Sequence, residues 1–330
     1  MTLKKLVIAI AGVLITLPTS TQTLDIERDN VQAFINVMVN EHQLARGDVE
    51  AVLKQAETKE SILEAMRRPA EKSKPWHAYR KIFLTSRRIR EGVAFWKTHR
   101  DAIESVADAR GVPPEIIVAI IGVETHYGRI TGSYRVVDAL STLAFDYPPR
   151  SPFFTKELEH FFLLSSEEPV ELLNAKGSYA GAMGAPQFIP SSYRRYAADG
   201  DDDGRRNLFT SWHDVFASIA NYFVEHGWQT GGPIVSRADG DPRLAERLEL
   251  RRLATVYRTE FLQQEGLQFE RLSGADDRAM VINFEGETEP EIWIGYQNFY
   301  VITRYNRSKM YAMAVHQLSE AIRDGMLVDE

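Results

Sequence analysis

The chain has 330 residues, of which 44% are hydrophobic and 26% are charged, and its formal net charge is -7. This composition excludes a disordered or collagen-like chain, and the length allows a large core and more than one domain. The negative net charge, without a long run of one sign, argues against a nucleic-acid partner. The chain has no cysteine, which excludes a disulfide framework.

The N-terminus has the layout of a secretory signal peptide. Lys4 and Lys5 precede an apolar stretch from 6 to 17, which is short for a membrane span, and small polar residues follow. We therefore predict a signal peptide over 1–23, cleaved between 20 and 23; a buried N-terminal helix is the alternative. No cysteine follows it to carry a lipid, so we expect a soluble periplasmic protein and not a lipoprotein.

The next part of the chain has helical periodicity. Apolar residues recur at three- and four-residue spacing, as at Val31, Phe34, Ile35 and Met38, which predicts an N-terminal helical domain over 24–110. A polar stretch with prolines interrupts this pattern from 67 to 76. We expect one long helix from 86 to 110, ending before a glycine.

A strongly apolar helix follows. Pro113 and Pro114 suit the first turn of a helix whose sequence, EIIVAIIGVE, is apolar almost all round, as in a helix that is buried on every side. With further helices expected at 136–146, 152–165 and 211–227, it predicts a helical core over 111–235.

The last third of the chain changes character. Residues 236–292 are more charged, with short apolar pieces such as AMVINFE, and indicate a small inserted β domain. The segment 293–306 is predicted to be extended and to return to the core. A final helix over 307–330 is expected to join the N-terminal domain, so the fold class is mainly α, with an α+β character.

Glu124 is a lone carboxylate at the end of the apolar run. Burial disfavours the ionised form of a carboxylic acid and raises its pKa, and a neutral acid at working pH is what protonation of a glycosidic oxygen requires. The alternative is a structural Glu that pairs with an arginine or caps a helix.

A glycine-rich stretch, GSYAGAMGAPQFIPSSY, covers residues 177–193. Its glycines allow a backbone to approach another group closely, and Ser178 and Gln187 could supply polar contacts to a sugar. A loop that packs under a helix is the alternative.

An acidic stretch reproduces the first half of an EF-hand loop. Asp199, Asp201 and Asp203 are followed by Gly204, and alternating carboxylates on a tight loop offer several oxygens to a hard cation. We predict a structural calcium ion, and a solvated acidic turn is the alternative. Arg205 is expected to contribute its backbone carbonyl as a further ligand. The distal position of the loop, where an EF-hand has a Glu, is Thr210 here, and Asp214 is a candidate to replace that Glu.

These motifs together resemble the lytic murein transglycosylase B family, exported bacterial enzymes that cut the glycan strands of peptidoglycan. The resemblance runs from about residue 34 to 321. It includes GVAFWKTHR, GVPPEIIVAIIGVETHYG, FDYPPRSPFF, GSYAGAMGAPQFIPSSY, NLFTSWHDVFASIANYFVEHGW and FYVITRYNRSKMYAMAV.

The resemblance implies a lysozyme-like helical core, a helical domain built from both chain ends, and a small β domain. It implies Glu124 as the single catalytic group, first an acid and then a base, with no cofactor for the chemistry. One carboxylate suffices if the C6 hydroxyl of N-acetylmuramic acid attacks its own anomeric carbon and leaves an anhydromuramic end.

The resemblance also assigns substrate contacts. It implies that Ser178, Gln187 and Tyr222 line the sugar-binding groove and that Tyr305 lies near the catalytic Glu. Arg150 matches one arginine of a pair that meets the peptide stem, but the other position is a proline here. The calcium loop belongs to the family pattern, except for the threonine at its distal ligand position.

Two other functions remain open from the sequence. One is a muramidase that uses water, and the other is a non-catalytic, calcium-stabilised protein that binds peptidoglycan. The expected partners are peptidoglycan glycan strands, with other cell-wall enzymes as further candidates, and the expected state is a monomer.

Overall fold

A computed structural model of the chain describes residues 21–67, 74–275 and 277–328. Most of the predicted signal peptide lies outside these residues and stays a prediction. Its last three residues form β1 (Thr21–Thr23), which pairs antiparallel with β2 (Glu57–Lys59). None of the helices in the described part of the chain has the length and apolar character that a membrane crossing requires.

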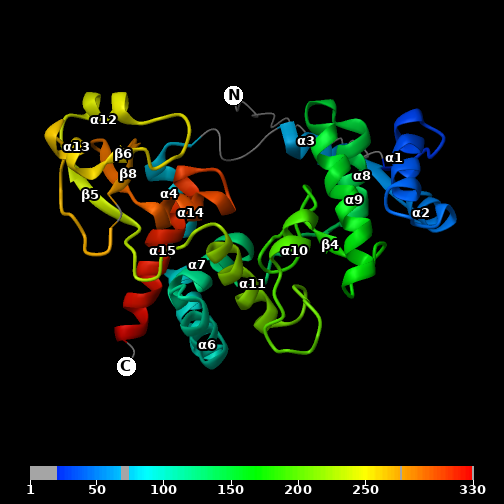
Figure 1. Cartoon of the computed structure of the whole chain (residues 1–330), viewed down its shortest axis with the longest axis horizontal. Coiled ribbons are helices and arrows are strands. Elements are labelled where there is room, and N and C mark those ends of the chain that lie inside the picture. The colour runs from blue at the N-terminus through cyan, green and yellow to red at the C-terminus, as the bar shows by residue number, and fades with distance from the viewer. Residues whose placement is uncertain (1–20, 68–73, 276, 329–330) are drawn as a thin grey trace, which may run out of the picture.

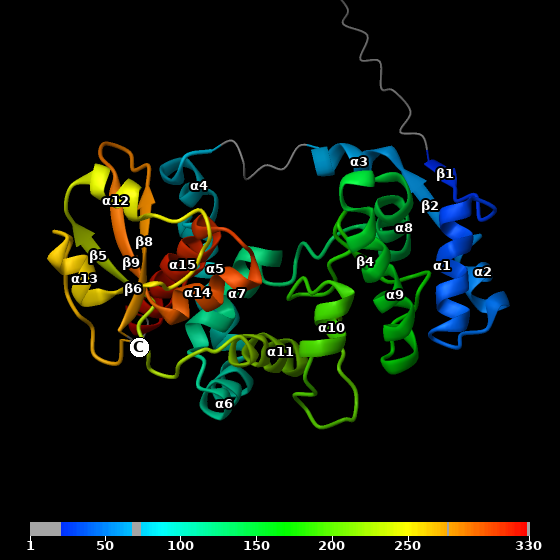
Figure 2. The ribbon, with the colours of Figure 1, turned by 45° about the horizontal axis from the view of Figure 1, so that its top comes forward.

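Helix α7 (Pro114–Thr125) lies at the centre of the largest core, with residues 116–122 all buried. A helix that is covered on every side needs no polar face, which explains its apolar sequence. The helices packed around it are α5 (Ser86–Thr98), α6 (Arg100–Arg110), α11 (Trp212–Glu225) and α15 (Lys309–Val328). In Figure 2 this group lies between the β-sheet and α10 (Pro190–Tyr196).

The prediction of one long helix over 86–110 is wrong, because the chain bends between α5 and α6. His99 ends α5 with φ -115° and ψ 22°, and its N–H bonds back to the carbonyl of Phe95. Its ring lies 5.3 Å from the ring of Trp212 in α11. No proline or glycine marks this position, so the bend depends on a tertiary contact that the local sequence does not reveal.

The predicted N-terminal domain, 24–110, packs in two separate places (Figure 1). Its first part packs against α8 (Val136–Asp146) and α9 (Ser151–Glu167), where Phe34 lies between Phe145 and Phe162 at ring distances of 5.9 and 5.7 Å. That part comprises β1, β2, α1 (Asp29–Asn40), α2 (Arg46–Leu53) and α3 (Glu60–Arg67). The second part, α4 (Trp76–Phe83) and α5, packs against α15 instead.

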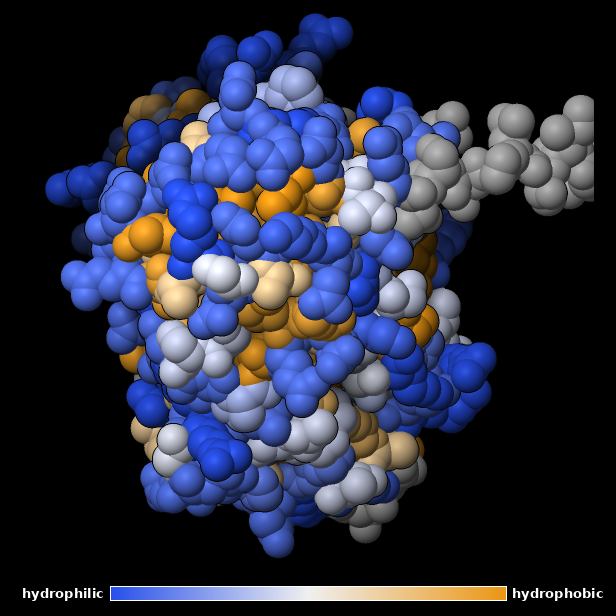
Figure 3. Space-filling model, turned by 90° about the vertical axis from the view of Figure 1, so that its right-hand side faces the viewer, coloured by the Kyte–Doolittle hydropathy of each residue, from blue (hydrophilic) through white to orange (hydrophobic). Residues whose placement is uncertain are grey.

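The end of the molecule that carries α1 and α2 is mostly hydrophilic, with apolar side chains in scattered patches (Figure 3). Helix α1 buries Val31, Phe34, Ile35 and Met38, so the periodic residues of the sequence form its inner face. Its exposed positions are mostly polar, namely Asp29, Asn30, Asn36 and Asn40, with Ala33 among them.

The predicted small β domain contains a five-stranded antiparallel sheet in the order β6-β8-β9-β5-β7. Alternate residues of β8 face two cores: Val281 packs among the domain's own residues, whereas Ile282 and Phe284 join the main core. Trp76 of α4 stacks on Phe284 at 4.7 Å. The elements of this domain are β5 (Val235–Asp239), α12 (Pro242–Leu248), β6 (Tyr257–Arg258), α13 (Thr259–Gln264), β7 (Gln268–Phe269), β8 (Arg278–Phe284) and β9 (Glu291–Gly295).

The prediction of an extended segment over 293–306 is correct only as far as the end of β9. Helix α14 (Gln297–Tyr305) follows at once. The aromatic and β-branched composition favours a strand, but Phe299, Val301 and Ile302 are completely buried in the main core. Packing against α15 therefore decides the conformation here.

Candidate active site

Glu124 lies in the last turn of α7, beside the C-terminal helix. Tyr311 of α15 donates a hydrogen bond of 2.6 Å to its Oε1 atom. Burial raises the pKa of Tyr305 and of Tyr311 well above the usual value, and the negative charge of Glu124 adds to this effect. Both phenols thus stay protonated beside the carboxylate. Glu124 itself is half-buried, so the apolar helix carries its carboxyl to the edge of the core and not into its centre.

Helix α7 ends directly after Thr125 through an unusual backbone conformation. His126 and Tyr127 both adopt left-handed conformations, with φ of 52° and 61°, which are uncommon for residues other than glycine. The ring of Tyr127 then folds back onto Gly122, where an added Cβ would lie 2.8 Å from it. The end of the helix, and with it the position of Glu124, depends on this packing.

An ionic network supports the same turn. His126 Nε2 lies 2.5 Å from Oε2 of Glu91 in α5, and Arg129 donates to Oε1 of Glu91 at 2.9 Å. The Arg129 guanidinium is the main reason that the pKa of Glu91 falls to about 2. From the same helix, Arg88 donates a 2.6 Å hydrogen bond to the Gly122 carbonyl in the last turns of α7.

The glycine-rich segment lies against the end of α7. Thr125 donates from Oγ1 to the Ala185 carbonyl at 3.0 Å, and Tyr305 donates to the Pro186 carbonyl at 2.7 Å. Hydrogen bonds from α7 and from α14 thus hold this segment against the end of α7 that carries Glu124.

Gln187 joins this segment to the loop after α7. Its Nε2 donates to the carbonyls of Thr131 at 3.0 Å and Gly184 at 2.9 Å, and its φ is 53°. Ser178 follows β4 (Lys176–Gly177), which pairs with β3 (Tyr134–Arg135) of the same loop. Its Oγ accepts the N–H groups of residues 180 and 182, so it also shapes a turn.

Tyr222 and Tyr305 belong to one aromatic cluster. Their rings lie 4.9 Å apart, and Phe188 lies 5.6 Å from the first and 5.8 Å from the second. The Tyr222 hydroxyl donates to the Arg304 carbonyl at 2.6 Å, and His226 stacks on the Tyr222 ring at 4.0 Å. The two predicted tyrosines therefore meet beside the glycine-rich segment.

Arg150 lies elsewhere in the described structure. It ends the 3-10 helix η2 (Pro148–Arg150) before α9 and is exposed. Its guanidinium lies 4.4 Å from the ring centre of Phe153 and 5.0 Å from that of Phe154. Neither contact reaches the cluster around Glu124.

The predicted metal loop connects α10 to α11. Carboxylate oxygens of Asp199, Asp201 and Asp203 all lie within 4.8 Å of one another, and Gly204 has the left-handed φ of 83° that a tight turn requires. Three convergent carboxylates form a donor set that suits a hard cation such as calcium. The N–H of Arg205, which is exposed, donates to Asp203 at 2.8 Å.

Asp214 does not join this carboxylate group. It is buried, its Oδ1 accepts the N–H of Gly200 at 2.8 Å, and its Oδ2 accepts the N–H of Asn207 at 2.6 Å. Burial raises its pKa. Asp214 therefore ties both ends of the loop to α11, and its role as a substitute ligand stays a prediction. Thr210, at the distal position, accepts a 2.6 Å hydrogen bond from the Asn207 side chain.

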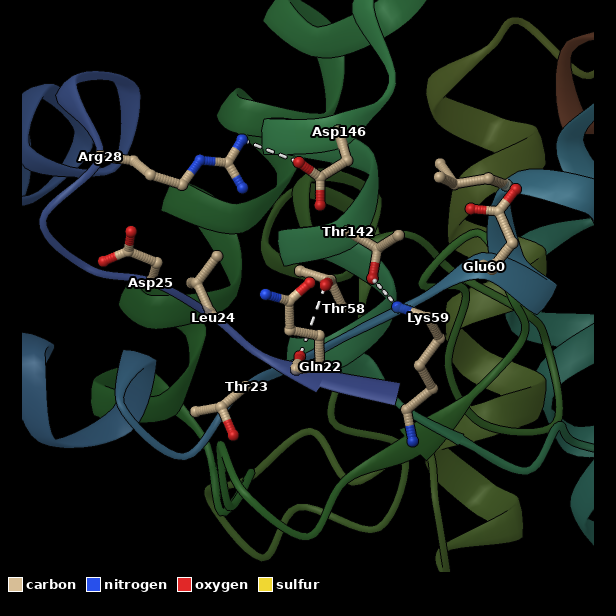
Figure 4. A pocket seen from close by; sticks show the side chains of 11 residues that line it. Gln22, Thr23, Leu24, Asp25, Arg28, Thr58, Lys59, Glu60, Thr142 and Asp146 are labelled. Atoms are coloured by element: carbon tan, nitrogen blue, oxygen red, sulfur yellow. Dashed lines mark hydrogen bonds and ion pairs between the residues drawn. The ribbon is translucent and has the colours of Figure 1, made fainter. Parts of the chain in front are cut away.

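A separate cavity of about 360 Å³ lies between the N-terminal strands and α8 (Figure 4). Arg28 donates to Asp146 at 2.7 Å across it, and the Lys59 N–H donates to Thr142 at 3.1 Å. It contains none of the predicted site residues. Several of its polar groups bond to one another, as expected of a seam between packed segments.

The sequence interpretation missed Tyr311, which makes the direct contact with Glu124. A signal was present, because Tyr311 is the one polar-tipped residue in the run YAMAV. A single hydroxyl in an apolar helix indicates a candidate site residue for the same reason that the single carboxylate of Glu124 does.

The comparisons with known proteins agree with this geometry. The chain matches the family model described as Transglycosylase SLT domain over residues 27–320. It is 42% identical over 303 residues to the membrane-bound lytic murein transglycosylase B of Escherichia coli (strain K12), covering 89% of this chain and 82% of that protein.

Two solved structures are similar along nearly their whole length. Soluble lytic transglycosylase SltB1 from Pseudomonas aeruginosa is 47% identical with a TM-score of 0.84, covering 89% of this chain and 98% of that one. Lytic transglycosylase Slt35 from Escherichia coli, in complex with bulgecin A, is 41% identical with a TM-score of 0.85, covering 93% and 97%. The fold is thus the lysozyme-like fold of these enzymes, and the chain belongs to the lytic murein transglycosylase B family.

Proposed function

We propose that this protein cleaves the β-glycosidic bond between N-acetylmuramic acid and N-acetylglucosamine in peptidoglycan and leaves anhydromuramic ends. The observation that carries the proposal is the position of Glu124, at the end of a buried helix with the Tyr311 hydroxyl on its carboxylate. A relative supports the product: SltB3 from Pseudomonas aeruginosa, 28% identical with a TM-score of 0.77, has been solved in complex with NAG-anhNAM-pentapeptide.

In this mechanism Glu124 acts twice. Its carboxyl proton passes to the glycosidic oxygen as the bond from that oxygen to the muramic C1 breaks. The carboxylate then takes the proton of the muramic C6 hydroxyl, whose oxygen forms the new bond to C1. The substrate supplies the nucleophile, so one carboxylate suffices, and Tyr311 holds that carboxylate in place.

We assign the sugar contacts to the residues gathered around Glu124. Ser178 and Gln187 shape the glycine-rich segment, and Tyr222 and Tyr305 form the aromatic cluster beside it. Aromatic faces and hydroxyls suit a sugar, which has apolar ring faces and polar edges. Arg150 is proposed as a contact to the peptide stem, outside this cluster.

We also propose that Asp199, Asp201 and Asp203 bind a structural calcium ion. The convergence of their carboxylates supports this, and Slt35, at 40% identity and a TM-score of 0.83, has been solved in complex with calcium. When bound, the ion would neutralise the repulsion among the three carboxylates and hold the loop between α10 and α11.

The proposed place of action is the periplasm, reached by means of the N-terminal signal peptide, where the protein acts as a monomer on glycan strands. The layout of residues 1–23 supports export. The relative from Escherichia coli is described as membrane-bound.

Mass spectrometry of purified peptidoglycan after digestion tests the proposed reaction. We expect fragments with anhydromuramic ends. Hydrated reducing ends would instead identify a muramidase that uses water, and the absence of cleavage would leave a binding protein; either result would contradict the proposal.

A further inference from the structure

Two neighbouring cavities on the described surface are lined by arginines. The first, of about 540 Å³, is bordered by Tyr222 and includes Arg195, Arg304 and Arg307. The second, of about 420 Å³, shares Arg304 and Arg307 and adds Arg251 and Arg252. We call these five residues (195, 251, 252, 304 and 307) the arginine track.

The charges of the track are not neutralised within the described part of the chain. None of its five guanidinium groups makes a salt bridge or a side-chain hydrogen bond there, although Arg195 lies 5.2 Å from the ring centre of Tyr196. The neighbouring Arg194 shows the contrast, since it pairs with Glu167 at 2.6 Å. Like charges that are gathered without partners repel one another, and a bound anion would relieve this repulsion.

The concentration of charge is unusual for this protein. The whole chain carries a net charge of -7, so the molecule as a whole repels an anionic polymer. The arginine track, in contrast, attracts it. Arginine binds carboxylates with two parallel hydrogen bonds, which gives both affinity and orientation.

The track begins where the aromatic cluster ends. Arg304 directly precedes Tyr305, and its carbonyl accepts the Tyr222 hydroxyl at 2.6 Å. Tyr222 itself borders the first cavity. A glycan seated against Tyr222 and Tyr305 would therefore carry its attached groups towards the arginines.

We propose that the arginine track binds the carboxylates of the peptides attached to the glycan held at Glu124. This inference rests on the proposed function, because it takes peptidoglycan as the substrate. It gives the track a role in choosing strands that carry peptides, in addition to the stem contact proposed for Arg150.

A binding experiment with an inactive protein tests the proposal. In a Glu124→Gln background, Arg195→Gln and Arg307→Gln are combined, because both side chains are exposed. Melting temperatures measured beside Kd show whether the variant is folded. Calorimetry then measures Kd for glycan chains with intact peptides and for chains from which an amidase has removed the peptides, which leaves the lactyl carboxylate on each muramic acid.

We expect the double substitution to raise Kd for the peptide-bearing chains by roughly tenfold, the effect of losing about 1.4 kcal/mol of charge-assisted bonding. The change should be much smaller for the stripped chains, and higher salt should reduce the difference between proteins. The double variant Arg243→Gln with Arg258→Gln is the matched control. Both side chains are exposed and line neither cavity, and together they remove the same two charges.

Three outcomes would overturn the inference. They are an unchanged Kd, an equal loss with stripped chains (which would assign the arginines to the sugar or its lactyl group), and an equal loss from the control with Arg243→Gln and Arg258→Gln. If the wild-type protein leaves peptidoglycan uncleaved, the proposed function itself fails. If it cleaves and the substitutions have no selective effect, only the arginine track fails.

Discussion

At the scale of single residues, the proposed chemistry depends on the carboxyl group of Glu124. Glu124→Gln keeps the size and shape of the side chain but removes the proton that the leaving oxygen requires. We expect kcat on peptidoglycan to fall by roughly 10³-fold or more, while the melting temperature and glycan binding stay close to those of the wild type. Cleavage at a near-normal rate would show that another group is the acid.

Tyr311→Phe tests how the carboxyl is held. The substitution removes the 2.6 Å hydrogen bond to Oε1 and keeps the buried ring. Because bonds to charged groups contribute about 1.5–3 kcal/mol, we expect kcat to fall by roughly 10- to 100-fold, less than in Glu124→Gln. KM should change little, because Tyr311 contacts the acid and not the sugar. An effect confined to KM would instead make Tyr311 a substrate contact.

At the scale of elements, the end of α7 depends on the contact between Tyr127 and Gly122. In Gly122→Ala, the new methyl group would lie 2.8 Å from the Tyr127 ring, and overpacking of this kind costs about 1–3 kcal/mol. We expect a clearly lower melting temperature. We also expect a lower kcat at a temperature where the variant is still folded, because the turn after Glu124 would move.

Gly47→Ala in α2 is the control for that substitution. A Cβ there would meet no atom within 4 Å, and alanine is the better helix former by about 1 kcal/mol. We expect the same or a higher melting temperature. A similar loss in both variants would mean that the Tyr127 contact is not the cause.

The ionic network on α5 predicts a specific response to acid. The folded-state pKa of Glu91 is about 2, below the ordinary value of 4.5, mainly because Arg129 bonds to it. As the pH falls, Glu91 is protonated in the unfolded chain before it is protonated in the folded chain. The stabilising effect of its charge is therefore complete above about pH 4.5 and is lost as the pH falls towards 2. Urea unfolding of Glu91→Gln should therefore show lower stability at pH 6 and a flatter fall between pH 4.5 and 2. Parallel pH curves for the two proteins would exclude this role.

At the scale of the whole molecule, the predicted metal loop connects α10, which follows the glycine-rich segment, to α11, which carries Tyr222. A ligand that binds only the folded form stabilises it by mass action, so adding calcium to chelated protein should raise the melting temperature. The missing distal Glu predicts a weak affinity, with Kd of roughly 0.1–1 mM. Asp203→Ala should remove most of the increase. A melting temperature that does not respond to saturating calcium would leave only an acidic turn.

Asp214→Ala separates the two roles within that loop. Both carboxylate oxygens of Asp214 accept backbone N–H groups, so its loss should lower the melting temperature by a similar amount with calcium and with chelator. If the loss appeared only with calcium, Asp214 would be a metal ligand after all.

The features that depend on local sequence pattern or on a motif could be predicted from the sequence. The all-round apolar sequence of α7 predicted a central helix with Glu124 at its end, and the spaced aspartates predicted a convergent cluster. The sequence did not predict the features that depend on contacts between distant parts of the chain. The break at His99 depends on Trp212, the helix at Gln297–Tyr305 depends on packing against α15, and the bond from Tyr311 to Glu124 joins residues 187 positions apart.

The position of Tyr311 on α15 has a consequence for the timing of activity. The partner of the acid follows it by 187 positions in the chain, and the helix that carries it also packs against α4, α5 and α7. A growing chain that already contains Glu124 thus still lacks the group that orients it and the surface that covers its helix. The active site is in this way kept incomplete until α15 has been made and has packed against α7.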